Sequence, residues 1–175
     1  METAKDEVRR ILDSLPDDAR TWVFAADPPL TGSRAEQLTL AVDEYLAGWK
    51  AHGSPLTVGR AFTDDRFLTV AVDQHTEGAS GCSIDGLFRA LQGVERALGV
   101  SLVAGGRAFW RDANGVVQGG TRDTFSGAAA SGGVNGSTPV FDTALGTLGD
   151  WRARFERPAA ESWHAQLLPT GVAAK

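Results

Sequence analysis

The order of strand-like and helix-like runs between residues 21 and 104 is the feature that most constrains the fold. Apolar, strand-like runs cover 21–26, 56–62, 66–72 and 100–104, while helix-like periodicity covers 33–49 and 83–98. The resulting order of strand, helix, strand, strand, helix, strand is that of a split βαβ sandwich. We therefore expect an α+β protein with a ferredoxin-like domain over residues 21–104.

Both helix-like runs carry end signals. Ser33 with Glu36 makes a capping box at the start of the first helix, and His52-Gly53 is expected to end it because glycine adopts left-handed conformations readily. Ser83 is the expected N-cap of the second helix, and Gly99 its end. Thr63-Asp64-Asp65 predicts a turn between the two central strands.

Shorter segments flank this domain. Val8, Ile11, Leu12 and Leu15 have helical spacing, which predicts a leading helix within residues 1–20. The composition shifts at Gly105-Gly106, and residues 105–168 are expected to form a second, smaller unit. The tail, 169–175, is expected to be frayed.

Within the second unit, Asn114-Gly115 predicts a tight hairpin turn. Thr121 is the expected cap of a short helix through Ala130, and residues 138–141 are the next expected strand. Pro158 suits the first turn of a closing helix carrying Trp163 and Leu167. Residues 143–157 favour neither helix nor strand.

Composition and charge disfavour some classes of function and location for this chain. The chain has 175 residues, 42% of them hydrophobic, and a formal net charge of −5. Its lysines and arginines are scattered, whereas nucleic-acid binding requires a concentrated basic surface, so nucleic acid is not expected as a partner. The N-terminus lacks a signal-peptide pattern and no apolar run is long enough to span a bilayer, which favours a cytoplasmic protein.

Four sequence segments resemble a family of small uncharacterised bacterial proteins. They are Trp49-Lys50-Ala51-His52-Gly53, Ser80-Gly81-Cys82-Ser83-Ile84-Asp85, Val140-Phe141-Asp142 and Ser162-Trp163-His164. Members are often labelled hypothetical protein or ABC transporter ATPase, so the resemblance implies no established activity. The sequence also lacks the Gly-x4-Gly-Lys-Ser/Thr loop that would hold nucleotide phosphates.

Residues 107–168 are similar to GYF-like adaptor domains. The similarity rests on Gly132 or Gly133, Val134, Thr138 and the pair Val140-Phe141, which follow a predicted hairpin and short helix. The resemblance implies a small interaction module. The Gly-Tyr-Phe tripeptide is absent, so the resemblance supplies a topology and no ligand.

The single cysteine, Cys82, is the best candidate for chemistry. It lies where the helix over 83–98 is expected to begin, and unpaired amides with the helix dipole favour a thiolate at such a position. The split topology places His52 and His75 at the same edge, which would allow a Cys82–His52 nucleophile and base, with Asp73 or Asp85 orienting an imidazole. Asp27 is expected at the opposite edge.

Other interpretations of the same residues remain open. The amides from Gly81 to Ile84 could bind a phosphate or carboxylate, although Asp85 would compete in the same turn. The candidate ligand-binding residues are Gly81, Ser83, His75, Asp73 and Asp85. Cys82 could equally be a small buried hydrophobe, with His52 a helix-end cation and His75 a solvated loop residue. No paired metal-ligand motif occurs, so neither a metal nor a cofactor is expected.

We therefore expect a non-catalytic binding module for a protein or small molecule. The alternative is a thiol-dependent enzyme with Cys82 as nucleophile and His52 as base. Trp110, Trp151 and Trp163 could form an aromatic surface for a partner, although Trp110 is better explained as core.

Overall fold

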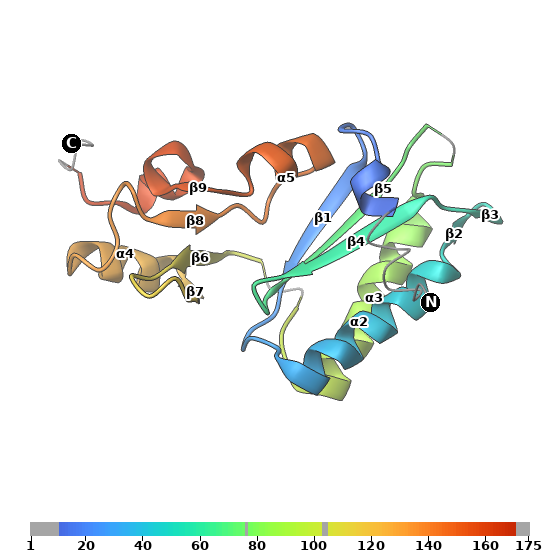
Figure 1. Cartoon of the computed structure of the whole chain (residues 1–175), viewed down its shortest axis with the longest axis horizontal. Helices are drawn as coiled ribbons and strands as arrows, with labels where there is room; N and C mark the ends of the chain where they lie inside the picture. Colours follow the sequence, from blue (N-terminus) through green and yellow to red (C-terminus); the bar gives the residue numbers. More distant parts are fainter. Residues whose placement is uncertain (1–10, 76, 103–104, 171–175) are drawn as a thin grey trace. The chain divides into compact units, whose positions relative to one another are not determined.

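The computed structural model describes residues 11–75, 77–102 and 105–170 and shows an α+β protein with antiparallel sheets (Figure 1). The chain divides into two compact units. Unit 1 comprises Met1–Val103 with Ala144–Arg152, and unit 2 comprises Ala104–Thr143 with Ala153–Lys175. No helix among the described residues is long and apolar enough to cross a membrane.

Unit 1 is built on a three-stranded antiparallel sheet in the order β1-β5-β4. The strands are β1 (Arg20–Ala25), β4 (Val58–Thr63) and β5 (Phe67–Val72). Every residue of β5 is buried because this strand is central and both of its faces are covered. Asp64 and Asp65 adopt positive φ angles in the β4–β5 turn, which confirms the predicted hairpin.

Two helices, α2 (Gly32–Ala47) and α3 (Gly81–Leu98), lie side by side on one face of this sheet (Figure 1). Leu38, Val42 and Leu46 of α2 share a core with Leu87 and Leu91 of α3. The helical spacing of these residues gives each helix an apolar stripe, and this stripe packs against the sheet.

The predicted boundaries of α2 were wrong at both ends. Its N-cap is Thr31, which makes no side-chain capping bond, so Ser33 and Glu36 do not form a capping box. The helix ends at Ala47 because the backbone that follows forms strand hydrogen bonds instead of helical ones. There, β2 (Lys50–Ala51) and β3 (Ser54–Pro55) make a small antiparallel hairpin. His52 and Gly53 are its turn.

The N-cap of α3 is Ser80 rather than the predicted Ser83. The Ser80 hydroxyl accepts a hydrogen bond from the Ser83 amide at 3.2 Å, and the Ser83 hydroxyl donates to the Ser80 carbonyl at 2.8 Å. The predicted end was right: Gly99 is in the left-handed conformation at φ 64°.

The other face of the sheet is covered by two segments distant in sequence. Leu12, Leu15 and Ala19 pack there with Leu148, which is fully buried at the start of α5 (Leu148–Arg154). Residues 11–14 are helical, and the rest of the predicted leading helix, 4–10, lies outside the described residues.

Close packing on this face requires Gly59 in β4. A Cβ at this position would lie 2.4 Å from the Leu12 amide nitrogen, so no larger residue fits without a shift of the backbone.

The strand predicted over residues 100–104 is reduced to an isolated bridge between Ser101 and Asp27 in the described part, and residues 103–104 lie outside it. Asp27 also lies within 3.6 Å of the Arg66 guanidinium, at the end of the sheet opposite Asp73.

Unit 2 contains a four-stranded antiparallel sheet in the order β7-β6-β8-β9. The strands are β6 (Arg107–Arg111), β7 (Val117–Thr121), β8 (Pro139–Phe141) and β9 (Glu156–Pro158). Helix α4 (Arg122–Ala130) begins after the predicted cap Thr121, whose hydroxyl accepts from the Thr124 amide at 3.1 Å. Gly115 has a φ of 79° in the β6–β7 turn, where the sequence predicts positive φ.

The C-terminal part of unit 2 differs from the expected closing helix. After Pro158 come two short 3-10 helices, η1 (Ala159–Glu161) and η2 (Trp163–Leu167). Trp110 is buried in the core of this unit with Phe125 and Val140. Trp151 packs in unit 1, so the three tryptophans do not form one aromatic surface within unit 2.

Candidate functional site

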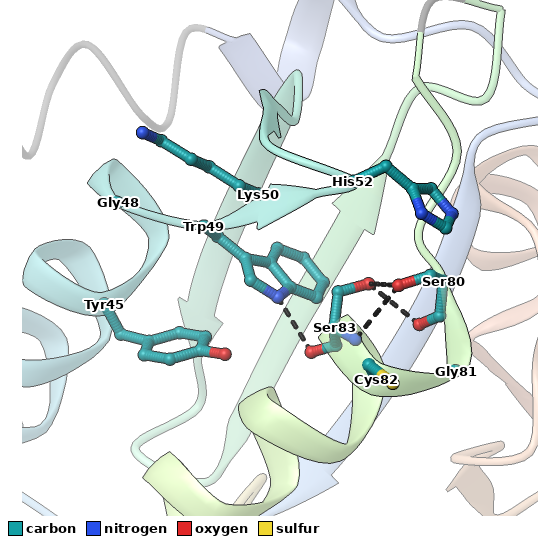
Figure 2. A pocket seen from close by; sticks show the side chains of 9 residues that line it. All are labelled: Tyr45, Gly48, Trp49, Lys50, His52, Ser80, Gly81, Cys82 and Ser83. Atoms are coloured by element: carbon teal, nitrogen blue, oxygen red, sulfur yellow. Dashed lines mark hydrogen bonds between the residues drawn. The ribbon is translucent and has the colours of Figure 1, made fainter.

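A pocket of about 640 Å³ opens in unit 1 between the C-terminal end of α2, the β2–β3 hairpin and the first turn of α3 (Figure 2). Its lining combines two aromatic rings, two basic side chains and a run of small residues: Tyr45, Gly48, Trp49, Lys50, His52, Ser80, Gly81, Cys82 and Ser83. None of these lining residues is acidic.

Trp49 fixes the relative position of the hairpin and α3. Its ring is almost fully buried, and its Nε1 donates a hydrogen bond to the Ser83 carbonyl at 2.8 Å. The same ring packs against Trp22 and Tyr45, each with its ring centre 6.2 Å away. These contacts tie the hairpin side of the pocket to the core of unit 1 and to the first turn of α3.

Tyr45 brings a hydroxyl group to the pocket. Burial raises the pKa of Tyr45 above its usual value of 10, although Arg89 opposes the shift, so the hydroxyl is protonated at neutral pH and able to donate. The neighbouring Gly86 leaves room for it, because a Cβ there would lie 2.5 Å from the Tyr45 oxygen.

The first turn of α3 supplies Gly81, Cys82 and Ser83. Cys82 is exposed, so the interpretation of this thiol as a small buried hydrophobe was wrong. Gly81 is exposed as well, whereas Ser83 is buried and its amide is satisfied by Ser80.

His52 reaches the pocket from the β2–β3 turn, where His52 and Gly53 have φ angles of 51° and 80°. Two successive positive φ angles are typical of a type I′ hairpin turn. Since α2 ends at Ala47, His52 is not the helix-end cation that one interpretation assumed. No hydrogen bond joins His52 to Cys82 among the described residues, and Figure 2 shows the sulfur directed away from the imidazole.

His75 and Asp73 lie outside the pocket lining. His75 Nδ1 is 2.9 Å from Asp73 Oδ1, and its Nε2 is 3.1 Å from Asp18 Oδ2. The hydrogen bond to Asp73, with the two nearby carboxylates, raises the pKa of His75, while the backbone and side chain of His75 lower the pKa of Asp73. These residues form a separate ion cluster in which His75 and Asp18 are exposed and Asp73 is partly buried. Asp85 is exposed on α3 and does not line the pocket.

The structure thus brings Cys82, His52, Gly81 and Ser83 together in the pocket lining, which does not include His75, Asp73 or Asp85. Sequence reasoning missed the contributions of Tyr45 and Trp49, because both fall on the apolar stripe that predicted core. In the part of the chain that is described, no group of three or more His, Cys, Asp or Glu side chains could hold a metal ion.

Comparisons with known proteins identify no relative. The sequence matches no family model and no curated protein, and the structure matches no solved structure.

Proposed function

We propose that this protein is a non-catalytic binding module that takes a small molecule in the pocket of unit 1. The observation that carries the proposal is the pocket itself, which is bounded by the buried indole of Trp49 and by the first turn of α3. A pocket framed by packed elements needs little ordering when a ligand binds, which lowers the cost of association.

The lining favours a ligand with an anionic group. Lys50 and His52 are the basic side chains of the lining, and no carboxylate lines the pocket. The amides of Gly81 and Cys82 lie in the first turn of α3, where the helix dipole favours a negative charge. Tyr45 adds an aromatic surface and a hydroxyl donor. We therefore choose benzoate, phenyl phosphate and inorganic phosphate as probes.

Ligand-induced stabilisation of the full chain tests the proposal. A ligand at 100 times its dissociation constant should raise the free energy of unfolding by about 2.7 kcal/mol. Methylthiolation of Cys82 adds bulk to the pocket and should abolish this stabilisation by the ligand, whereas the Cys82→Ala variant should still be stabilised. If none of the three probes stabilises the protein, or if a probe stabilises the methylthiolated protein as much as the unmodified one, the proposal is wrong.

A thiol-dependent enzyme is the second candidate, since exposed Cys82 shares the pocket with His52. For His52 to act as base, it must approach the sulfur when substrate binds. This candidate predicts that His52→Asn slows iodoacetamide alkylation of Cys82 at least tenfold. An unchanged rate in a folded variant would exclude His52 as the base.

We also propose a ferredoxin-like fold for unit 1 and a GYF-like fold for unit 2. The first is supported by β1 and β4, which are both antiparallel to the intervening β5, and by the Ser101–Asp27 bridge beside β1. A GYF-like unit 2 is supported by its hairpin, α4 and β8. We further propose that the protein belongs to the small bacterial family that its sequence resembles, and acts in the cytoplasm.

A further inference from the structure

Unit 2 contains a histidine with no access to solvent. His164 is fully buried in η2, where its ring stacks on Trp163 at 3.8 Å and lies 5.4 Å from the ring of Phe125 in α4. Its Nδ1 is 2.9 Å from the Ser162 hydroxyl. Its Nε2 is buried and has no hydrogen-bond partner among the described residues.

Charged groups of three neighbouring elements act on this ring. Arg122, at the start of α4, lies over the Trp163 ring with its guanidinium carbon 5.0 Å from the ring centre. Arg157 in β9 lies 3.9 Å from Asp142, which follows β8. Burial, opposed by Asp142 and reinforced by Arg157 and Arg122, lowers the pKa of His164 from its usual 6.5 to about 4.

We propose that His164 makes unit 2 acid-sensitive: protonation of its buried imidazole opens the η2 segment away from α4. The neutral ring is compatible with this site because one nitrogen is hydrogen-bonded and the other is uncharged. A protonated ring would place a positive charge among aromatic side chains without an acceptor for the second N–H. The attraction of the Asp142 carboxylate does not offset burial together with the repulsion of Arg157 and Arg122.

The direction of the pH effect follows from linkage. An exposed histidine in the opened segment binds a proton at higher pH than the buried ring does. The closed form is therefore fully favoured above about pH 6.5, and its advantage is lost as the pH falls toward about 4. Between pH 7 and pH 5 the opening equilibrium should increase about twentyfold.

Hydrogen exchange of the full-length protein measures this opening. The amides of Ala165 and Leu168 donate to Ser162 and Ala165 within this region, so they report on η2. After correction for intrinsic exchange rates, we expect their protection to be about twentyfold lower at pH 5 than at pH 7. Equal protection at both pH values would overturn the proposal.

Two variants test whether the pH dependence of η2 opening comes from the His164 imidazole. His164→Phe keeps an aromatic ring without a titrating group and should remove most of the pH dependence, as should His164→Gln if the first variant does not fold. His52→Phe, which changes an exposed histidine of unit 1, should keep the twentyfold change. A pH dependence that survives in a folded His164 variant would contradict the proposal.

Direct titration of the wild-type ring provides a test that needs no variant. The Cε1 proton of His164 should titrate with a midpoint below pH 5. A midpoint at pH 6 or above would show that the folded state accommodates the protonated ring, and it would overturn the proposal.

Discussion

The indole Nε1 of Trp49 donates a 2.8 Å hydrogen bond to the carbonyl of Ser83, which joins the β2–β3 hairpin to the first turn of α3. This bond is buried and spans 34 residues of sequence. It connects the hairpin that carries Lys50 and His52 to the helical turn that carries Gly81 and Cys82, and all four residues line the pocket.

Trp49→Phe should lower the free energy of unfolding by about 2 kcal/mol, since it removes a buried hydrogen bond and part of a core ring. Denaturant unfolding followed by circular dichroism measures the loss. Trp22→Phe is the matched control, because Trp22 is only partly buried and its indole makes no such bond to α3. Equal losses in the two variants would show that the Trp49 bond contributes little.

A buried ion pair ties α2 to the sheet. Arg60 Nε and Nη2 donate to the two carboxylate oxygens of Asp43 at 2.7 and 2.6 Å, and the two residues are only 3% and 8% exposed. Asp43→Ala leaves a buried guanidinium without this partner and should cost about 3–5 kcal/mol. The double variant Asp43→Leu, Arg60→Met should be more stable than the single variant. A double variant that is less stable would contradict this account.

The core of unit 1 includes the segment Ala144–Arg152, which follows residues Ala104–Thr143 of unit 2 in the sequence. Leu148 is fully buried there, and the Arg152 guanidinium donates to Asp17 and to the carbonyls of Leu12, Asp13 and Leu15. Leu148→Ala should lower the free energy of unfolding by about 2–5 kcal/mol and reduce amide protection in β5. Val116→Ala, at a position 55% exposed, should change little. Normal β5 protection in Leu148→Ala would mean that the segment is not part of this core.

The exposed cluster around His75 should respond to pH in the opposite direction to His164. Because the hydrogen bond to Asp73 raises the pKa of His75, its stabilising contribution is complete below pH 6.5 and is lost as the pH rises through the raised pKa. An NMR titration of the His75 ring should give a midpoint above 6.5 that falls in Asp73→Asn. It should fall less in Asp18→Asn, since the Asp73 hydrogen bond is the larger cause.

The sequence predicts those features that neighbouring residues determine. The β4–β5 turn follows from Asp64 and Asp65, the start of α4 from Thr121, and the end of α3 from Gly99. Each depends on the conformational preference of a short segment, which the sequence shows directly.

Features set by distant contacts could not be predicted in the same way. The cap of α3 could be Ser80 or Ser83, because both are serines and only the position of the first turn distinguishes them. The burial of Leu148 against Leu12 joins segments far apart in sequence. The pocket depends on the early end of α2, after which Trp49 turns into the core and His52 enters a hairpin turn.

A two-dimensional amide NMR titration of the ¹⁵N-labelled full-length chain with phenyl phosphate tests the binding proposal most directly. We predict saturable shifts concentrated at the amides of Trp49, Gly81, Cys82 and Ser83, and their loss when Cys82 is methylthiolated. Absence of saturable shifts at these amides with phenyl phosphate, benzoate and inorganic phosphate alike, or the same shifts in the methylthiolated protein, would contradict the account.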